Sequence, residues 1–230
     1  EQELEAAFSR LRLRVIGDVD DRRDNEFKVR VGGKVNLPAI SRRLDLVFRG
    51  DEPDDMMDGE DPMQTRVGLQ YQLGKRDVFT RGRWDLTLGA NSSGLKPGVR
   101  YRYFTDLSER NTLHFTQRLQ HDSGDPGFTA ISRLDLDHEL SERQFLRSLT
   151  RVLKSEDSDG YEWNTSLGYF SRWMDADRAH LNKRASYAYV SVEGITEPTS
   201  SISNYKVGWR YRRQSFRDYL FLEFEPSYNW

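Results

Sequence analysis

Apolar and polar side chains alternate along this chain with a period of two, and residues 204–213 (NYKVGWRYRR) show the pattern clearly. One parity is apolar and aromatic and consists of Tyr205, Val207, Trp209 and Tyr211. The other parity carries the basic residues Lys206, Arg210 and Arg212. Because successive side chains of a strand point to opposite faces, the segment predicts a strand with one apolar and one cationic face.

The same alternation recurs along almost the whole chain. It occurs in residues 27–37, 42–50, 66–74, 81–89, 98–104, 111–119, 128–138, 161–170 and 219–226. Repetition over so many segments predicts an all-β protein. Two segments fit less well, because residues 145–153 (FLRSLTRVL) also suit a helix and residues 185–192 (ASYAYVSV) are apolar on both parities. We predict strands for both, since their neighbours are strands.

Two kinds of connection alternate between these segments. One kind is short and of mixed charge, such as GKRD and DLSER, and the other is generally longer and rich in Asp, Gly, Ser or Pro, such as GDEPDDMMDGEDPM and ANSSGLKP. This arrangement predicts an antiparallel up-and-down meander of about 13 strands, within a range of about 12 to 14. We expect one domain over residues 10–230, preceded by a short N-terminal helix or linker over residues 1–9.

The composition changes the picture of where the apolar faces point. Hydrophobic residues make up 36% of the chain and charged residues 31%, which is a thin supply for the core of a soluble domain of this length. Aromatic residues nevertheless reach 12%, which argues against disorder. The net charge of −2 provides no basic field for nucleic acid, there are no cysteines, and no apolar run of about 18 residues predicts a transmembrane helix.

These features favour a transmembrane antiparallel up-and-down β-barrel with an apolar outer band and a polar lumen. The predicted location is the bacterial outer membrane, where lipid and lipopolysaccharide would contact the apolar side. A soluble β-sandwich or lipocalin-like barrel, and a nucleic-acid binder with aromatic and basic residues interleaved, remain as alternatives.

The segment DYLFLEFEP, residues 218–226, carries a family resemblance. Along almost its whole length the chain resembles Gram-negative outer-membrane β-barrels, and it is similar to a group of proteobacterial barrels of uncharacterised function whose last hairpin contains such a segment. In that group a further apolar strand follows and ends the chain, whereas the present sequence stops at Trp230. The resemblance implies the barrel fold and no particular activity.

The number of strands raises a question of closure. Bacterial single-chain barrels have even strand numbers, so with a count of about 13 either a fourteenth strand is missing from this sequence or the count is off by one. We favour a missing strand. The rival interpretation is that residues 220–230 (LFLEFEPSYNW) form the closing strand themselves.

The parity of each segment assigns side chains to the two sides of the predicted barrel. The lumen-lining set is Arg30, Arg43, Arg49, Arg66, Arg83, Arg100, Arg102, Arg118, Arg133, Arg147, Arg151, Arg210, Arg212, Asp135, Glu223 and Glu225, and the acids Asp45, Asp85, Asp137 and Glu162 share this parity. The lipid-facing aromatic girdle is Trp84, Tyr101, Tyr103, Trp163, Tyr169, Tyr205, Trp209 and Tyr211.

An arginine-rich lumen predicts a narrow porin-like channel that attracts small anionic solutes. The alternative is a non-conducting structural barrel that pairs arginines with carboxylates and anchors or scaffolds an envelope-spanning complex. Continuous unpaired arginines predict the channel, and closed arginine–carboxylate ladders predict the structural barrel. Possible partners are therefore periplasmic or envelope proteins, and we expect neither a cofactor nor nucleic acid.

We expect no enzyme, although a lipid hydrolase or acyltransferase is a third class. His121, Asp122 and Ser123 are adjacent in sequence, but adjacency does not make a catalytic triad. No histidine pair has the spacing of metal ligands. The carboxylate-rich residues 51–62 suggest a loop that could bind calcium, although they lack the register of a calcium-binding helix–loop–helix.

Overall fold

The computed structural model describes residues 10–18, 26–36, 44–48, 67–73, 81–91, 94–123, 127–174, 183–215 and 221–230, and all regular secondary structure in these ranges is β-strand. The strands are β1 (Arg10–Asp18), β2 (Glu26–Asn36), β3 (Leu44–Phe48), β4 (Val67–Leu73), β5 (Gly82–Asn91), β6 (Gly94–Ser108), β7 (Asn111–Asp122), β8 (Gly127–Ser141), β9 (Gln144–Ser155), β10 (Glu162–Met174), β11 (Lys183–Ile195), β12 (Ser201–Gln214), β13 (Phe221–Phe224) and β14 (Ser227–Asn229). The helix predicted over residues 1–9 lies outside the described residues.

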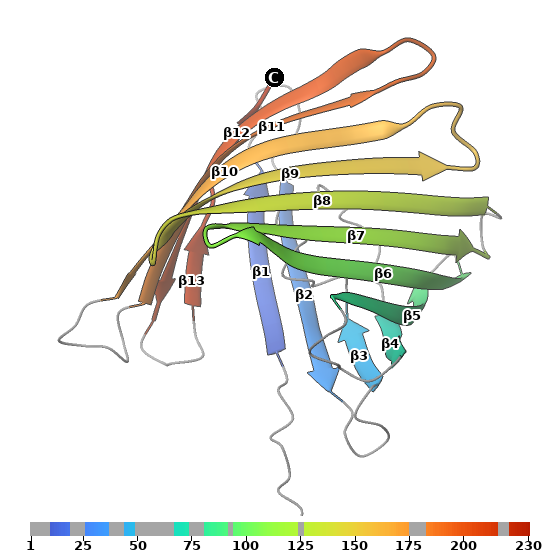
Figure 1. Ribbon diagram of the computed structural model, residues 1–230, viewed down its shortest axis with the longest axis horizontal. Coiled ribbons are helices and arrows are strands. Elements are labelled where there is room, and N and C mark those ends of the chain that lie inside the picture. The colour runs from blue at the N-terminus through green and yellow to red at the C-terminus, as the bar shows by residue number, and fades with distance from the viewer. Residues whose placement is uncertain are drawn as a thin grey trace, which may run out of the picture. The chain divides into compact units, whose positions relative to one another are not determined.

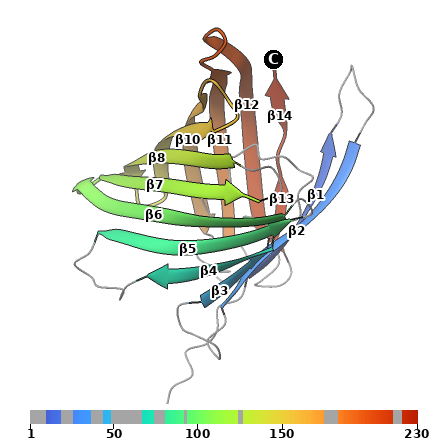
Figure 2. The ribbon, with the colours of Figure 1, turned by 90° about the vertical axis from the view of Figure 1, so that its right-hand side faces the viewer.

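The strands form one sheet in which each strand lies beside its neighbour in sequence, from β1 to β13 (Figures 1 and 2). The described registers are antiparallel, so the predicted all-β, up-and-down arrangement is confirmed. Among the described residues no pairing joins β1 to β13 or β14, so the sheet is not closed.

The chain divides into two compact units, and each is described by itself below. Unit 1 consists of Glu1–Asp77, Arg83–Arg100 and Leu119–Phe128, and unit 2 of Val78–Gly82, Tyr101–Arg118 and Thr129–Trp230.

The last two strands occupy a single position in the sheet. Both β13 and β14 pair with β12, and the chain between them contains Pro226. Proline has no backbone N–H to donate, which accounts for the interruption, although the Pro226 carbonyl still accepts a hydrogen bond from the Trp209 N–H at 3.0 Å. In the part of the chain that the structure describes, the sheet therefore has thirteen positions, β1 to β13 in order.

The two ambiguous segments are both strands. Residues 145–153 lie within β9, where the pairing partners β8 and β10 override the weak helical pattern. In β11, Tyr187 and Tyr189 are buried and the alternate residue Val190 is 51% exposed, so the two apolar parities face different environments.

The prediction of a loop over ANSSGLKP is wrong in extent. Strand β5 continues to Asn91 and β6 begins at Gly94, so only two residues connect them. Gly94 has a φ of 149°, a conformation that glycine adopts readily because it lacks Cβ. The Ser123 hydroxyl accepts a hydrogen bond from the Leu95 N–H at 2.8 Å and so ties β6 to the end of β7.

Burial along the strands is inverted relative to a soluble sheet. Asp85 is fully buried, Arg100 is 1% exposed and Asp135 3% exposed, whereas large apolar side chains on the alternate parity are exposed. Among the described side chains, only Leu149, Tyr187 and Tyr189 are buried apolar or aromatic residues. Each unit therefore has one polar face, which carries the buried charged residues, and one apolar face, whose large side chains are exposed.

Two tyrosine–glycine contacts fix the fit between neighbouring strands of unit 2. Tyr187 of β11 lies over Gly168 of β10, where an added Cβ would come within 2.1 Å of the tyrosine ring. Tyr189 lies over Gly208 of β12, where an added Cβ would come within 2.4 Å of the ring. Because these glycines leave room that the rings fill, polar-face packing depends on the absence of a side chain at both positions.

Substitution Gly168→Ala should therefore lower the free energy of unfolding by about 1–3 kcal/mol through overpacking against Tyr187. Gly89→Ala is the matched control, because its Cβ would lie 3.6 Å from the nearest atom, an ordinary contact. Guanidinium denaturation of the two variants measures the difference, and equal midpoints would refute the packing role of Gly168.

Candidate functional site

The candidate site is the polar face, and in unit 1 its centre is Asp85 on β5. The Arg100 guanidinium on β6 donates from Nε and Nη2 to Asp85 Oδ2, both at 3.4 Å. Arg83 Nε lies 3.2 Å from Asp85 Oδ1. One fully buried carboxylate thus balances two guanidinium groups, of which only Arg83 is substantially exposed, at 34% of its side chain.

A second charged pair joins β6 to the end of β7 in unit 1. The Lys96 ammonium contacts the Asp122 carboxylate, and the Lys96 side chain is 10% exposed. The buried charges of unit 1, at Asp85 and at Lys96, are therefore paired with opposite charges, as expected when ionised groups leave water.

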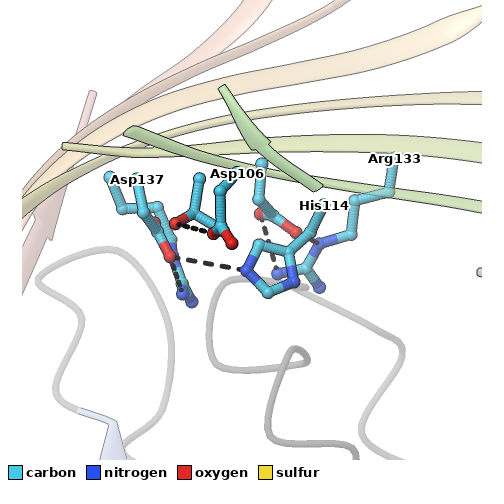
Figure 3. A network of polar contacts seen from close by, with 7 residues as sticks. Asp106, His114, Arg133 and Asp137 are labelled. Atoms are coloured by element: carbon cyan, nitrogen blue, oxygen red, sulfur yellow. Dashed lines mark hydrogen bonds and ion pairs between the residues drawn. The ribbon is translucent and has the colours of Figure 1, made fainter. Parts of the chain in front are cut away.

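In unit 2 the polar face is centred on Asp137 of β8. Arg147 of β9 donates from Nε to Asp137 Oδ1 at 2.6 Å and from Nη2 to Oδ2 at 2.7 Å, the fork geometry of a strong ion pair. His114 Nε2 of β7 lies 3.9 Å from Asp137 Oδ2. Figure 3 shows His114 and Asp137 on the same side of the strands.

The network in Figure 3 extends over β6, β7 and β8, which carry Asp106, His114 and Arg133. Arg133 donates from Nε to Asp135 Oδ2 at 3.0 Å, two residues along the same strand. The Thr112 hydroxyl donates to Asp106 Oδ1 at 3.2 Å. Arg133 also lies directly opposite Arg151 of β9 in the register, and Asp135 lies two residues along β8, opposite Leu149.

A ladder of aromatic rings crosses the same face from β9 to β11. The ring centroids of Phe145 and Phe170 are 4.3 Å apart, those of Phe170 and Tyr187 4.0 Å, and those of Tyr187 and Tyr189 5.1 Å. The Arg147 guanidinium lies 5.7 Å from the Phe145 centroid and 5.6 Å from the Phe170 centroid. The ladder thus supplies an apolar layer and a cation–π contact beside the Arg147–Asp137 pair.

The far end of the ladder meets a second group of charges. The Tyr189 hydroxyl donates to Glu225 Oε1 at 3.1 Å. Arg210 donates from Nε to Glu225 Oε2 at 2.8 Å, and its Nε lies 3.5 Å from Glu223 Oε1. Two carboxylates from the end of the chain therefore compensate one nearly buried arginine of β12.

The structure brings most of the described lumen-lining set into pairs. Arg83, Arg100, Arg133, Arg147 and Arg210 pair with carboxylates, and Arg102, Arg118, Arg151 and Arg212 also take part in polar or ring contacts. Arg43, Arg49 and Arg66 lie outside the described residues, and so does the side chain of Arg30 on β2.

The predicted girdle residues lie on the apolar parity with varying exposure. Trp84 is 52% exposed, Trp209 44% and Tyr205 37%. The remaining five, Tyr101, Tyr103, Trp163, Tyr169 and Tyr211, are half-buried. Trp209 and Tyr211 stack with their centroids 5.8 Å apart, and Tyr205 stacks on Trp230 at 5.7 Å.

Sequence reasoning missed the aromatic ladder. Phe145 and Phe170 were hidden because they share the parity of arginines and polar residues, and Tyr187 and Tyr189 because their segment is apolar on both parities. The signal that could have found them is an aromatic residue on the polar parity beside glycines on the adjacent strands.

The three adjacent residues considered for catalysis, His121, Asp122 and Ser123, are described by the structure. The His121 ring packs against Phe128 with centroids 4.9 Å apart, while Asp122 pairs with Lys96 and Ser123 bonds to Leu95. Each of the three adjacent residues thus contacts a different partner. Residues 51–62 lie outside the described residues.

Comparison of the chain with protein-family models, with curated proteins and with solved structures found no match. In the part of the chain that the structure describes, no helix has the length and apolar character needed to cross a membrane.

Removing the carboxylate of Asp85 should be severely destabilising. Asp85→Asn leaves the buried Arg100 charge without its counter-ion, which should lower the free energy of unfolding by about 3–5 kcal/mol. Asp157→Asn, at an exposed turn position, makes the same charge change and should stay within about 0.5 kcal/mol of the parent.

The double substitution Asp85→Leu with Arg100→Met supplies the second arm of this test. It removes both buried charges together and should recover most of the loss caused by Asp85→Asn. Denaturant unfolding measures all three proteins, and a double variant no more stable than Asp85→Asn would contradict the pairing argument.

Proposed function

We propose that this chain forms a closed β-barrel that spans the bacterial outer membrane and serves mainly as a structural, non-conducting element. The observation that carries the membrane part is the inverted burial, in which Arg100 is 1% exposed while the apolar Leu167 is 52% exposed. Such a distribution suits lipid on the apolar side and polar contacts on the other. The proposal includes closure of the sheet into a barrel. In hydrocarbon, the backbone N–H and C=O groups of an open sheet edge would have no hydrogen-bond partner.

The apolar face of unit 2 supports a membrane span by its length. On β10 the positions of this face run from Trp163 to Trp173, an aromatic residue at each end. Ten residues of strand extend about 33 Å, and a tilt of about 40° shortens this to about 25 Å along the membrane normal. That value matches the apolar band of outer-membrane barrels.

The band is also continuous across neighbouring strands. In one cross-strand row, Leu167 lies opposite Val190, Val190 opposite Val207, and Val207 opposite Tyr228. Leu167, Val190, Val207 and Tyr228 are all exposed, and none carries a charge. A wide exposed surface of this kind would be an association hazard in water and is a favourable lipid contact.

The structural role is supported by the arginine–carboxylate pairs that the described residues form on the polar face. Arg100, Arg147 and Arg210 each donate to a carboxylate, and the aromatic ladder packs between the pairs. Guanidinium groups held in this way are poor stepping sites for an anion, because a passing ion must displace a fixed carboxylate. The barrel would then anchor or scaffold an envelope complex.

A narrow channel for small anionic solutes is the second candidate. It is favoured by the clustering of arginines at two places, where Asp85 contacts both Arg83 and Arg100 and where Arg133 lies opposite Arg151. Such sites would attract carboxylates, sulfates or phosphates.

A charge placed in the apolar band tests the membrane part. Val207→Arg should destabilise the bilayer-inserted protein by about 2–4 kcal/mol. Ser201→Arg, an exposed position at the start of the same strand, should change stability by no more than about 0.5 kcal/mol. Unfolding from liposomes measures both, and a neutral Val207→Arg would point to a soluble protein.

Conductance in a planar bilayer separates the structural role from the channel. The inserted protein should give no steady conductance across a salt gradient. Steady anion-selective steps that diminish in Arg102→Glu would overturn the structural role and establish the channel.

A further inference from the structure

The apolar face of unit 2 ends in a row that carries two arginines. At this end of the sheet Trp173 of β10 lies opposite Arg184 of β11, Arg184 lies opposite Arg213 of β12, and Arg213 lies opposite Leu222 of β13. We call these four residues the basic row. Trp173 is 44% exposed and Leu222 63% exposed, so the arginines are flanked by accessible apolar groups.

The register places these two arginines directly opposite each other. Side chains directly opposite on antiparallel strands have Cβ atoms about 5 Å apart, where like charges are destabilising. An anion between the guanidinium groups would be attracted to both. Each guanidinium has five N–H donors, so a contact made elsewhere leaves donors for such an anion.

The residues next to the basic row suit the headgroup region of a lipid. In the adjacent row Ser171 lies opposite Ser186, Ser186 opposite Tyr211, and Tyr211 opposite Phe224. Hydroxyl groups and aromatic rings of this kind are favourable at the interface between the hydrocarbon core and the lipid headgroups. None of the described residues in either row is acidic.

The same sheet end carries the tightest turns of unit 2. Two residues, Glu142 and Arg143, connect β8 to β9, and the Arg143 carbonyl accepts a hydrogen bond from the Arg172 N–H at 2.9 Å, next to Trp173. Glu109 and Arg110 form an equally short turn between β6 and β7. Tight turns are typical of the periplasmic end of an outer-membrane barrel, and the leaflet there consists of glycerophospholipids.

We propose that Arg184 and Arg213 bind the phosphate of an anionic glycerophospholipid in the periplasmic leaflet. The guanidinium groups donate to the phosphate oxygens, and Trp173 and Leu222 contact the glycerol and the upper acyl chains. This site rests on the proposed membrane location, but it requires neither the structural role nor the channel. It would fix the depth and rotation of the barrel in the membrane.

The test measures binding of phosphatidylglycerol to the detergent-solubilised full chain by native mass spectrometry. Arg184→Gln with Arg213→Gln should weaken binding by about tenfold or more, because each arginine near an anionic headgroup contributes appreciably. Arg110→Gln with Arg143→Gln removes the same charge from the two tight turns and should leave the affinity within about twofold of the parent.

Two further variants guard against a folding artefact. Arg213→Gln alone changes one exposed side chain and should weaken binding severalfold. Arg184→Lys with Arg213→Lys retains the charge and should restore much of the affinity. Equal binding by the parent and the double glutamine variant would overturn the proposal.

Lipid A and phosphatidylcholine serve as the comparison lipids. The site should prefer phosphatidylglycerol to both, and stronger binding of lipid A that is lost in the double glutamine variant would overturn the choice of leaflet. Insertion into liposomes is measured separately. A chain that does not insert contradicts the proposed membrane span, whereas an inserted chain with arginine-independent lipid binding contradicts only this site.

Discussion

Pairing of buried guanidinium groups with carboxylates is the constraint on which the rest of this structure depends. Arg100 and Asp85 are both almost completely buried, and neither could remain so as an unpaired ion. Because the partners sit on neighbouring strands, as do Arg147 and Asp137, each pair also specifies which positions face each other across a strand boundary. A shift of one residue would separate these cross-strand pairs and send the charges of the shifted strand to the apolar face.

The aromatic ladder and the two glycines, together with the ion pairs, determine how the polar face of unit 2 packs. Phe145, Phe170, Tyr187 and Tyr189 stack across three strands, and Gly168 and Gly208 provide the space for the tyrosine rings. Tyr189 connects this apolar layer to the charges, since its hydroxyl donates to Glu225, which also binds Arg210. The polar face of unit 2 is therefore a mixed layer in which rings and ion pairs support each other.

The two faces of the sheet differ in polarity and exposure, and the proposals follow from that difference. Burial on the polar face uses charges that compensate one another, which accounts for the proposed structural role. The exposed face has an uncharged band bounded by aromatic residues and then by Arg184 and Arg213, which accounts for the proposed membrane span and lipid site. The proposed lipid phosphate would lie between Arg184 and Arg213 much as the Asp85 carboxylate contacts both Arg83 and Arg100.

The alternation of apolar and polar residues determined the strands and the parity of most charged residues, because side-chain direction in a strand follows directly from position. The alternating short and long connections determined the antiparallel order. The alternation of residues therefore identified Arg83, Arg100, Arg133, Arg147 and Arg210 as members of one kind of face. It could not choose their partners, since the register between strands depends on packing between segments far apart in sequence. The tertiary structure decided that Asp85 serves two arginines, that the loop before Gly94 is only two residues long, and that Tyr187 and Tyr189 lie over glycines of other strands. These features arise from contacts across strands, and the pattern along one strand carries no information about such contacts.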